Sequence, residues 1–332
     1  MKIAVFSAQT YDKHFLDEAN QRQSEPFDLI YQPASLSLQT VGFAQGCDAI
    51  CIFVNDMLDA PVLHALKSLG VRGVFLRCAG FNNVDLDAAD ELGFLVARVP
   101  AYSPEAVAEH TIALIMTLNR HTHRAYNRVR EGNFMLDGLL GVTLHEKTFG
   151  IIGMGKIGRA VAKIANGFGC KVLGYDPVVS PEFATLGETV DLNTLLARSD
   201  IVTLHCPLVE DNRHLINAEK LHLMRPEAML INTSRGALID TRAVIAALKS
   251  RRLGALAIDV YEEEGPLFFQ DRSSDIIADD VFQRLMTFPN VLVTGHQGFF
   301  TIEAMREIAG VTFLNLNCLA KGTNCPNAVV RK

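Results

Sequence analysis

The segment TFGIIGMGKIGRAVAKIANGFG, residues 148–169, decides the fold of this chain. Its apolar start predicts a buried β-strand, and its second half has the periodicity of an amphipathic helix. Between them, Gly153, Gly155 and Gly158 form a GxGxxG pattern. In such a turn the first glycine permits the tight bend, the second lets the backbone approach a pyrophosphate, and the third lets the helix pack on the strand. The segment therefore predicts a dinucleotide site at the helix N-terminus, with a plain strand-to-helix turn as the alternative.

Asp176 ends the next apolar run, KVLGYD, and stands 18 residues after Gly158. An acidic residue at about this offset binds the adenosine ribose hydroxyls of NAD and repels the 2′-phosphate of NADP. Pro177, Val178 and Val179 follow, so no arginine or lysine stands there to pair with that phosphate. The pattern favours NAD over NADP, and a surface aspartate that only ends a strand is the alternative.

Six apolar runs predict the strands of one parallel sheet, because strands covered by helices on both faces are apolar throughout. They are TFGIIG at 148–153, KVLGYD at 171–176, DIVTLHC at 200–206, AMLINTS at 228–234, GALAIDV at 254–260 and VLVTGH at 291–296. An earlier series alternates apolar runs at 3–6, 49–54 and 74–77 with amphipathic stretches from Lys13 and over 61–69. Both series have the βα order that is typical of α/β proteins.

Two domains are expected, because 332 residues exceed the roughly 250 to 300 at which a single core stops growing. The stretch from Ser103 to Arg130 predicts one long helix between the two series, with Ser103 as N-cap and Pro104 at the first helical position. A helix over residues 301–319 suggests that the chain then returns to the first domain. We predict a dinucleotide-binding domain over residues 101–299, inserted into a domain made of residues 1–100 and 300–332.

Composition and charge exclude several classes of partner. The net charge is −6, without a block of five like charges, which gives no reason to expect nucleic acid or an acidic membrane. The apolar run 112–118 is far shorter than the roughly 20 residues that cross a bilayer, and no export signal is visible. Seven cysteines without a CxxC pair argue against a disulfide framework or a zinc site. We expect a cytoplasmic protein that acts on small molecules and holds no metal.

The position of the glycine motif narrows the family. L-lactate and malate dehydrogenases carry it near the chain start, whereas 152 residues precede Gly153 here. Along essentially its whole length the chain resembles the D-2-hydroxyacid dehydrogenases, and among them the fermentative D-lactate dehydrogenases. The motifs that carry this resemblance are RCAGFNNVDLDAA at 77–89, PAYSPEAVAEH at 100–110, HCPL at 205–208, NTSRGALID at 232–240, DVYEEE at 259–264 and GHQGFFT at 295–301.

The resemblance implies an architecture and an activity. The fold would be a Rossmann-type doubly wound coenzyme domain inserted into a flavodoxin-like substrate domain. The activity would be the NADH-dependent reduction of pyruvate to D-lactate. A homodimer or homotetramer built on the coenzyme domains would be the assembly.

The resemblance assigns catalysis to Arg235, Glu264 and His296, which follow predicted strands at the edge where α/β sheets bind ligands. A guanidinium can grip a carboxylate with two hydrogen bonds and polarise the neighbouring ketone, which suits Arg235. Imidazole titrates near neutral pH, so His296 suits proton donation to the carbonyl oxygen. Glu264 would fix the tautomer of that ring and favour its charged form. A surface arginine, a solvated acidic run and a core histidine are the alternatives for the three.

The remaining site residues are carried over from the family. The backbone N–H groups of Ala79 and Gly80 and the hydroxyl of Tyr102 would meet the substrate carboxylate. Phe53 and Phe299 would form walls beside the substrate methyl group. Cofactor contacts would come from the backbone of Lys156, Ile157, Thr233 and Ser234, from Cys206, Pro207 and Asn212 near the ribose and adenine, from Arg235, and from Asp259 on the nicotinamide amide.

Three questions stay open at this point. Gly298 stands where the family commonly has alanine, so a larger 2-oxo acid is an alternative substrate. The family also includes corepressors that bind NAD to control assembly, so an NAD-sensing binding protein is a second alternative. The irregular stretch 262–280 is a long insertion before the last predicted strand, and such loops are often functional.

Overall fold

The computed structural model of the chain describes residues 1–178 and 180–329. Val179, one of the residues on which the preference for NAD was argued, lies outside them. The chain forms two compact units, one made of Met1–Ser103 and Phe299–Lys332, the other of Pro104–Gly298. The crossings from one unit to the other fall three residues and one residue from the predicted boundaries at 100/101 and 299/300.

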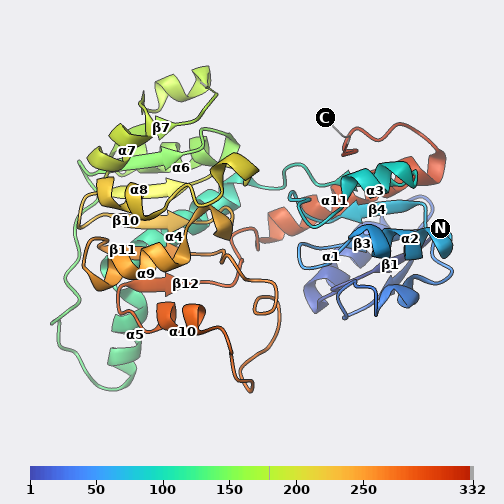
Figure 1. Cartoon of the computed structure of the whole chain (residues 1–332), viewed down its shortest axis with the longest axis horizontal. Helices are drawn as coiled ribbons and strands as arrows, with labels where there is room; N and C mark the ends of the chain where they lie inside the picture. Colours follow the sequence, from blue (N-terminus) through green and yellow to red (C-terminus); the bar gives the residue numbers. More distant parts are fainter. Residues whose placement is uncertain (179, 330–332) are drawn as a thin grey trace. The chain divides into compact units, whose positions relative to one another are not determined.

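Seven parallel strands form the sheet of the second unit, in the order β12-β11-β10-β9-β6-β7-β8 (Figure 1). Their bounds are β6 Thr148–Ile152, β7 Lys171–Tyr175, β8 Glu188–Thr189, β9 Ile201–Leu204, β10 Met229–Asn232, β11 Ala255–Ile258 and β12 Val291–Val293. The chain starts at the centre and runs to one edge, then returns to the centre and runs to the other, as in dinucleotide-binding folds. The predicted doubly wound sheet is confirmed, with one strand more than the six expected. β8 was missed because it is two residues long and exposed.

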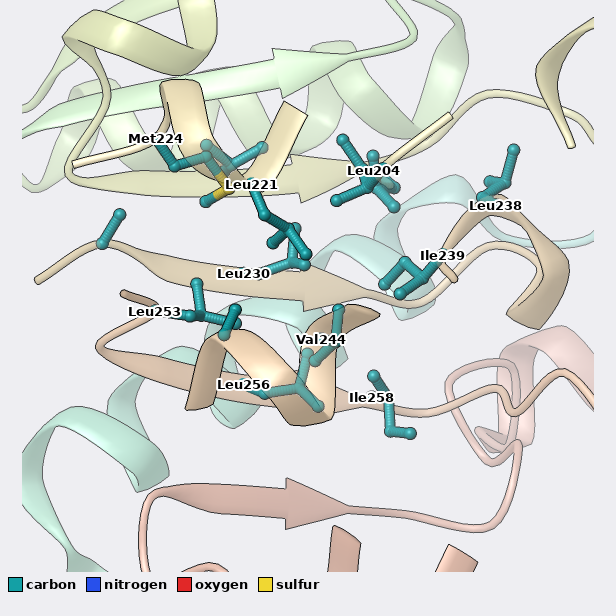
Figure 2. Packing of buried hydrophobic residues seen from close by; sticks show 14 of the residues in the cluster. Leu204, Leu221, Met224, Leu230, Leu238, Ile239, Val244, Leu253, Leu256 and Ile258 are labelled. Atoms are coloured by element: carbon teal, nitrogen blue, oxygen red, sulfur yellow. The ribbon is translucent and has the colours of Figure 1, made fainter. Parts of the chain in front are cut away.

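Helices cover both faces of this sheet (Figure 1). On one face lie α4 Pro104–Arg120 and α6 Lys156–Gly167, and on the other lie α7 Leu192–Arg198, α8 Ala218–Leu223, α9 Thr241–Lys249 and α10 Asp280–Met286. Short 3-10 helices occur at η2 Pro181–Thr185, η3 Glu210–Asn212 and η4 Gly236–Leu238. Figure 2 shows Leu204, Leu230 and Leu256 of three neighbouring strands packed with Leu221 of α8 and Val244 of α9. This apolar core fixes the strands whose ends carry the site.

The first unit is built on five parallel strands in the order β2-β1-β3-β4-β5 (Figure 1). They are β1 Lys2–Val5, β2 Asp28–Tyr31, β3 Ala49–Ile52, β4 Gly73–Leu76 and β5 Leu95–Arg98. The helices are α1 Thr10–Gln21, α2 Ala60–Ser68, α3 Leu86–Glu91 and α11 Ile302–Lys321, with the 3-10 helix η1 Val41–Ala44. The order 2-1-3-4-5 is that of flavodoxin-like sheets. α11 contacts α1, β4 and β5, so the last segment of the chain packs on this unit.

The prediction of one long helix from Ser103 to Arg130 was wrong. α4 ends at Arg120, and a separate helix α5, Thr122–Arg130, follows. His121 between them has φ 51°, a left-handed conformation that cannot continue a right-handed helix. α5 buries no residue. Together with residues 131–143 it forms what we call the exposed arm. Its most exposed large apolar side chains are Phe134, Met135, Leu136 and Leu140, exposed by 73%, 63%, 81% and 92%.

Candidate active site

The glycine-rich turn after β6 lies at the centre of the sheet of the second unit. Gly153 has φ 100°, and a Cβ there would lie 2.5 Å from the backbone nitrogen of Cys206, after β9. A Cβ on Gly158 would lie 2.0 Å from the carbonyl oxygen of Gly153. A Cβ on Gly155 would meet no atom within 4 Å. The first and third glycines are therefore required by the packing, whereas the second leaves open space beside the turn.

That open space adjoins the N-terminus of α6, where Lys156 and Ile157 are the first helical residues. Their N–H groups have no acceptor within the helix, so they can bind an anion. β6 and β9 are the neighbours between which the strand order reverses, the usual ligand crevice of such sheets. Asp176, after β7, lies beside the turn, because one of its carboxylate oxygens accepts from the N–H of Met154 at 2.8 Å. These features fit the pyrophosphate and the adenosine ribose of a dinucleotide.

A hydrogen bond joins the loop after β9 to the loop after β10. The hydroxyl of Ser234 donates to the carbonyl oxygen of Cys206 at 2.6 Å. Burial raises the pKa of the Cys206 thiol to about 11, so this side chain is neutral at physiological pH. Thr233 is buried, and its hydroxyl pairs with that of Thr111 at 2.9 Å. The hydroxyl groups of Ser234 and Thr233 are thus occupied within the chain.

The side chain of Asn212 makes its hydrogen bonds within its own loop. Its side-chain amide donates to the carbonyl oxygen of Pro207 at 2.7 Å and accepts from the N–H of Val209 at 2.8 Å. The amide therefore stabilises the loop after β9. Its predicted contact with the cofactor stays a prediction.

Asp259, which follows β11, is 1% exposed and organises the loop after β12. Its carboxylate accepts from the N–H groups of Gln297 and Gly298 at 2.9 and 2.8 Å, and from the Thr294 hydroxyl. The His110 ring lies 3.2 Å from the same carboxylate. Burial raises the pKa of Asp259, but the bonds from His110, Thr294 and Gln297 outweigh it and hold the pKa below its usual value. Asp259 therefore anchors the loop after β12, and its contact with nicotinamide stays a prediction.

His296 lies in this anchored loop with φ 55°, and its N–H donates to the carbonyl oxygen of Asp259 at 2.7 Å. Its Nδ1 lies 2.8 Å from Oε1 of Glu264, whose Oε2 accepts from the N–H of Tyr261 at 2.9 Å. A carboxylate can only accept, so Nδ1 carries the hydrogen of this bond and Nε2 is left for proton transfer. The structure thus brings together two predicted residues that are 32 positions apart.

Arg235 follows β10 and precedes η4. A Cβ on Gly236 would lie 2.1 Å from the carbonyl carbon of Tyr261, so the Arg235 loop packs against the loop that leads to Glu264. The guanidinium donates to the carbonyl oxygen of Ser234 at 2.7 Å, and it forms no ion pair with a carboxylate of the described residues. Its charge is available for an anionic ligand.

In the first unit the three predicted aromatic residues form one cluster. The ring centroid of Phe299 lies 5.9 Å from that of Phe53 and 6.1 Å from that of Tyr102. Arg77, only 1% exposed, lies under Phe53 at 5.1 Å and is paired with Asp12 at 3.0 Å. This buried ion pair was not predicted, because Asp12 and Arg77 are 65 positions apart.

The predicted anion-binding backbone lies directly after Arg77. The N–H groups of Ala79 and Gly80 donate to no acceptor within the described residues. Arg98 holds this loop, because its guanidinium donates to the carbonyl oxygen of Ala79. The sequence did not single out Arg98, the last residue of β5, a strand that was also not predicted.

Phe269 is a further residue that the sequence did not single out. Its ring lies 5.6 Å from the imidazole of His296, within the second unit. The only sequence signal was the length of the insertion 262–280, which indicated function but no particular side chain. In residues 1–178 and 180–329, no helix is long and apolar enough to span a bilayer, and no group of His, Cys, Asp and Glu could hold a metal ion.

Comparison with known proteins gives matches over the full chain. Residues 112–298 match the family model of the D-isomer specific 2-hydroxyacid dehydrogenase, NAD binding domain. The chain is 59% identical to 2-hydroxyacid dehydrogenase A of Aspergillus oryzae, over 100% of this chain and 96% of that relative. Among solved structures, apo D-lactate dehydrogenase from Escherichia coli gives a TM-score of 0.91 at 51% identity, over 99% of this chain and 100% of that one. The pyruvate reductase of Chlamydomonas reinhardtii gives 0.92 at 44%, over 98% of both chains.

Proposed function

Because the chain belongs to the D-isomer specific 2-hydroxyacid dehydrogenase family, we propose that it reduces pyruvate reversibly to D-lactate with NADH. The observation that carries this proposal is the His296–Glu264 pair at 2.8 Å. Arg235, which forms no ion pair among the described residues, follows a strand of the same NAD-binding sheet at the same edge. A proton donor, its carboxylate partner and a free guanidinium are the groups that reduction of a 2-oxo acid requires. Relatives named for D-lactate and pyruvate support this choice of substrate.

In this proposal each side chain has one task. NADH, when bound, supplies the hydride for the carbonyl carbon. Arg235 holds the substrate carboxylate through two parallel hydrogen bonds, and its charge draws electrons toward the carbonyl oxygen. His296 donates the proton from Nε2 to that oxygen, and it removes the hydroxyl proton in the reverse direction. Glu264 holds Nδ1 and balances the charge of the imidazolium.

The substrate contacts that the family resemblance assigns to the first unit stay predictions. The N–H groups of Ala79 and Gly80 would bind the carboxylate with the Tyr102 hydroxyl, and Phe53 and Phe299 would limit the side chain to a methyl group. The glycine at 298 does not argue for a larger substrate. A Cβ there would lie 3.0 Å from the Asp259 carboxylate and 3.4 Å from the His110 ring, so the missing methyl group faces those two side chains.

A substrate screen tests the proposal. Purified protein is given NADH with pyruvate, 2-oxoisocaproate, hydroxypyruvate or glyoxylate, and NAD with formate. We expect the highest kcat/KM with pyruvate, and D-lactate as the product on chiral chromatography. A preference for 2-oxoisocaproate would assign the chain to the dehydrogenases of larger acids. No turnover of any of these compounds, or L-lactate as product, would refute the proposal.

Replacing Asp176 with serine should narrow the preference for NADH over NADPH by about tenfold or more, because the carboxylate next to the turn repels a 2′-phosphate. The measurement is kcat/KM for both cofactors in the wild type and in Asp176→Ser. The exposed Asp191→Ser, at the start of α7, serves as the control for loss of one negative charge. If the wild-type protein uses NADPH as well as NADH, Asp176 does not select the cofactor.

We also propose that the chain assembles into a homodimer or homotetramer in the cytoplasm. The exposed arm supports assembly, because several large, highly exposed apolar side chains on one segment are typical of an interaction surface. All seven cysteines are free, as expected for a reducing compartment. Light scattering of the wild type and of a Leu136→Asp, Leu140→Asp variant would measure the assembly, and a wild-type monomer would contradict it.

A further inference from the structure

The insertion 262–280 places one aromatic side chain against the proposed proton donor. The ring centroid of Phe269 lies 5.6 Å from that of the His296 imidazole, with an angle of 42° between the planes. Phe269 has φ 62° and His296 has φ 55°. A positive φ is unfavourable for side chains other than glycine, and it persists where the surrounding structure imposes it. Two such residues therefore face each other at the proton-transfer site.

The turn before Phe269 fixes the direction of its ring. The N–H groups of Leu267 and Phe268 both donate to the carbonyl oxygen of Glu264 at 2.9 Å. Phe268 is 8% exposed and packs edge to face on Phe282 of α10, at 6.1 Å. Phe268 thus points into the core while the next ring, that of Phe269, lies on His296. The carboxylate partner of His296 and its aromatic neighbour belong to the same anchored turn.

The pair that Phe269 adjoins is partly exposed to solvent. The side chain of His296 is 16% exposed and that of Glu264 is 24% exposed. The attraction between a carboxylate and an imidazolium weakens when water surrounds it. An aromatic ring at this distance from the imidazole excludes water from one side of it and restricts its rotation.

We propose that Phe269 is a positioning residue of the proton-transfer site: a cap that keeps water from the His296–Glu264 pair and holds the imidazole for proton donation. This inference rests on the proposed function of His296. Phe269 acts through His296 and needs no contact with the substrate. Its unfavourable backbone conformation serves the site rather than the stability of the loop.

The variants distinguish the effect of the Phe269 ring from the effect of its backbone conformation. Phe269→Gly removes the ring and relieves the positive φ, whereas Phe269→Tyr keeps both. Arg251→Gly is the matched control, because Arg251 has φ 57° and is exposed in the loop after α9. Phe269→Leu replaces the glycine variant if that one does not fold.

The first readout needs no cofactor or substrate. Diethyl pyrocarbonate modifies accessible histidines, and peptide mass spectrometry measures the rate at His296. We expect a severalfold higher rate in Phe269→Gly and the wild-type rate in Phe269→Tyr and Arg251→Gly. The kcat for pyruvate should fall by about tenfold in Phe269→Gly, part of the roughly 10²–10⁴ that general acid–base catalysis provides. The Kd for NADH should not rise, and the Tm should not fall.

The outcomes distinguish this inference from the proposed function. If His296→Asn keeps its activity, the proposed function fails whatever Phe269 does. If His296→Asn is inactive but Phe269→Gly shows wild-type modification of His296 and wild-type kcat, the cap is overturned. A lower Tm with unchanged modification of His296 also overturns it, because Phe269 would then only stabilise the loop.

Discussion

Arg235→Lys should lower kcat/KM for pyruvate by about a hundredfold or more, equivalent to about 3 kcal/mol of lost transition-state stabilisation. Lysine keeps the positive charge but cannot present two parallel donors to a carboxylate. In the structure the guanidinium donates to a carbonyl oxygen and forms no ion pair with a carboxylate of the described residues. Its remaining donors are therefore available for the substrate. KM should rise and kcat should fall, because the same group binds the carboxylate and polarises the ketone. Steady-state kinetics and a separate NADH titration measure the two effects.

The control for this variant is Arg242→Lys, which changes an exposed arginine on α9 in the same way. It should keep wild-type kinetics, and both variants should bind NADH like the wild type. A near-wild-type kcat/KM for Arg235→Lys would remove Arg235 from the active site. If Arg235→Lys lost affinity for NADH to the same extent as kcat/KM, the loop after β10 would instead have lost its structure.

The parts of the fold that local patterns encode were predictable from the sequence. The glycines at 153 and 158 have no room for a side chain, so packing requires two of the three glycines in the motif that predicted the central turn. The apolar strands of the second unit were predictable because helices cover both faces of its sheet. β8 and the break at His121 were not, since a two-residue exposed strand and a single left-handed residue leave no periodic signal.

The site was predictable to the extent that motifs carry it. His296 and Glu264 were predicted as a pair from the resemblance, and the structure places them in one hydrogen bond. Asp259 was assigned to the cofactor, but its buried carboxylate accepts hydrogen bonds from Gln297 and Gly298 beside His296. Such contacts between loops 38 and 39 positions apart depend on the sheet that aligns the strand ends. No spacing rule along the chain contains them, and the same is true of Phe269 on His296.

Glu264→Gln should move the pH profiles of both reaction directions to lower pH. The wild-type carboxylate lies 2.8 Å from Nδ1 of His296 and balances the charge of the imidazolium. Glutamine lacks that charge, so the protonated ring of His296 loses its opposite charge and is less stabilised than in the wild type. Reduction needs the protonated ring, so its alkaline limb should move to lower pH. Oxidation of the hydroxy acid needs the neutral ring, so its rise with pH should begin at lower pH as well.

The measurement is kcat/KM against pH in each direction, at fixed ionic strength because salt screens exposed charge pairs. Glu263→Gln is the matched control, since Glu263 is the exposed neighbour in the same acidic run and should leave both profiles unchanged. A glutamine at 264 can accept from the Tyr261 N–H or from Nδ1 through its one oxygen, so a lower kcat is expected in addition. That loss of rate alone would also follow from a purely structural function of Glu264. Only a shift of both limbs to lower pH shows that the charge of Glu264 acts on His296. Limbs that stay in place or move to higher pH would contradict the proposed pairing.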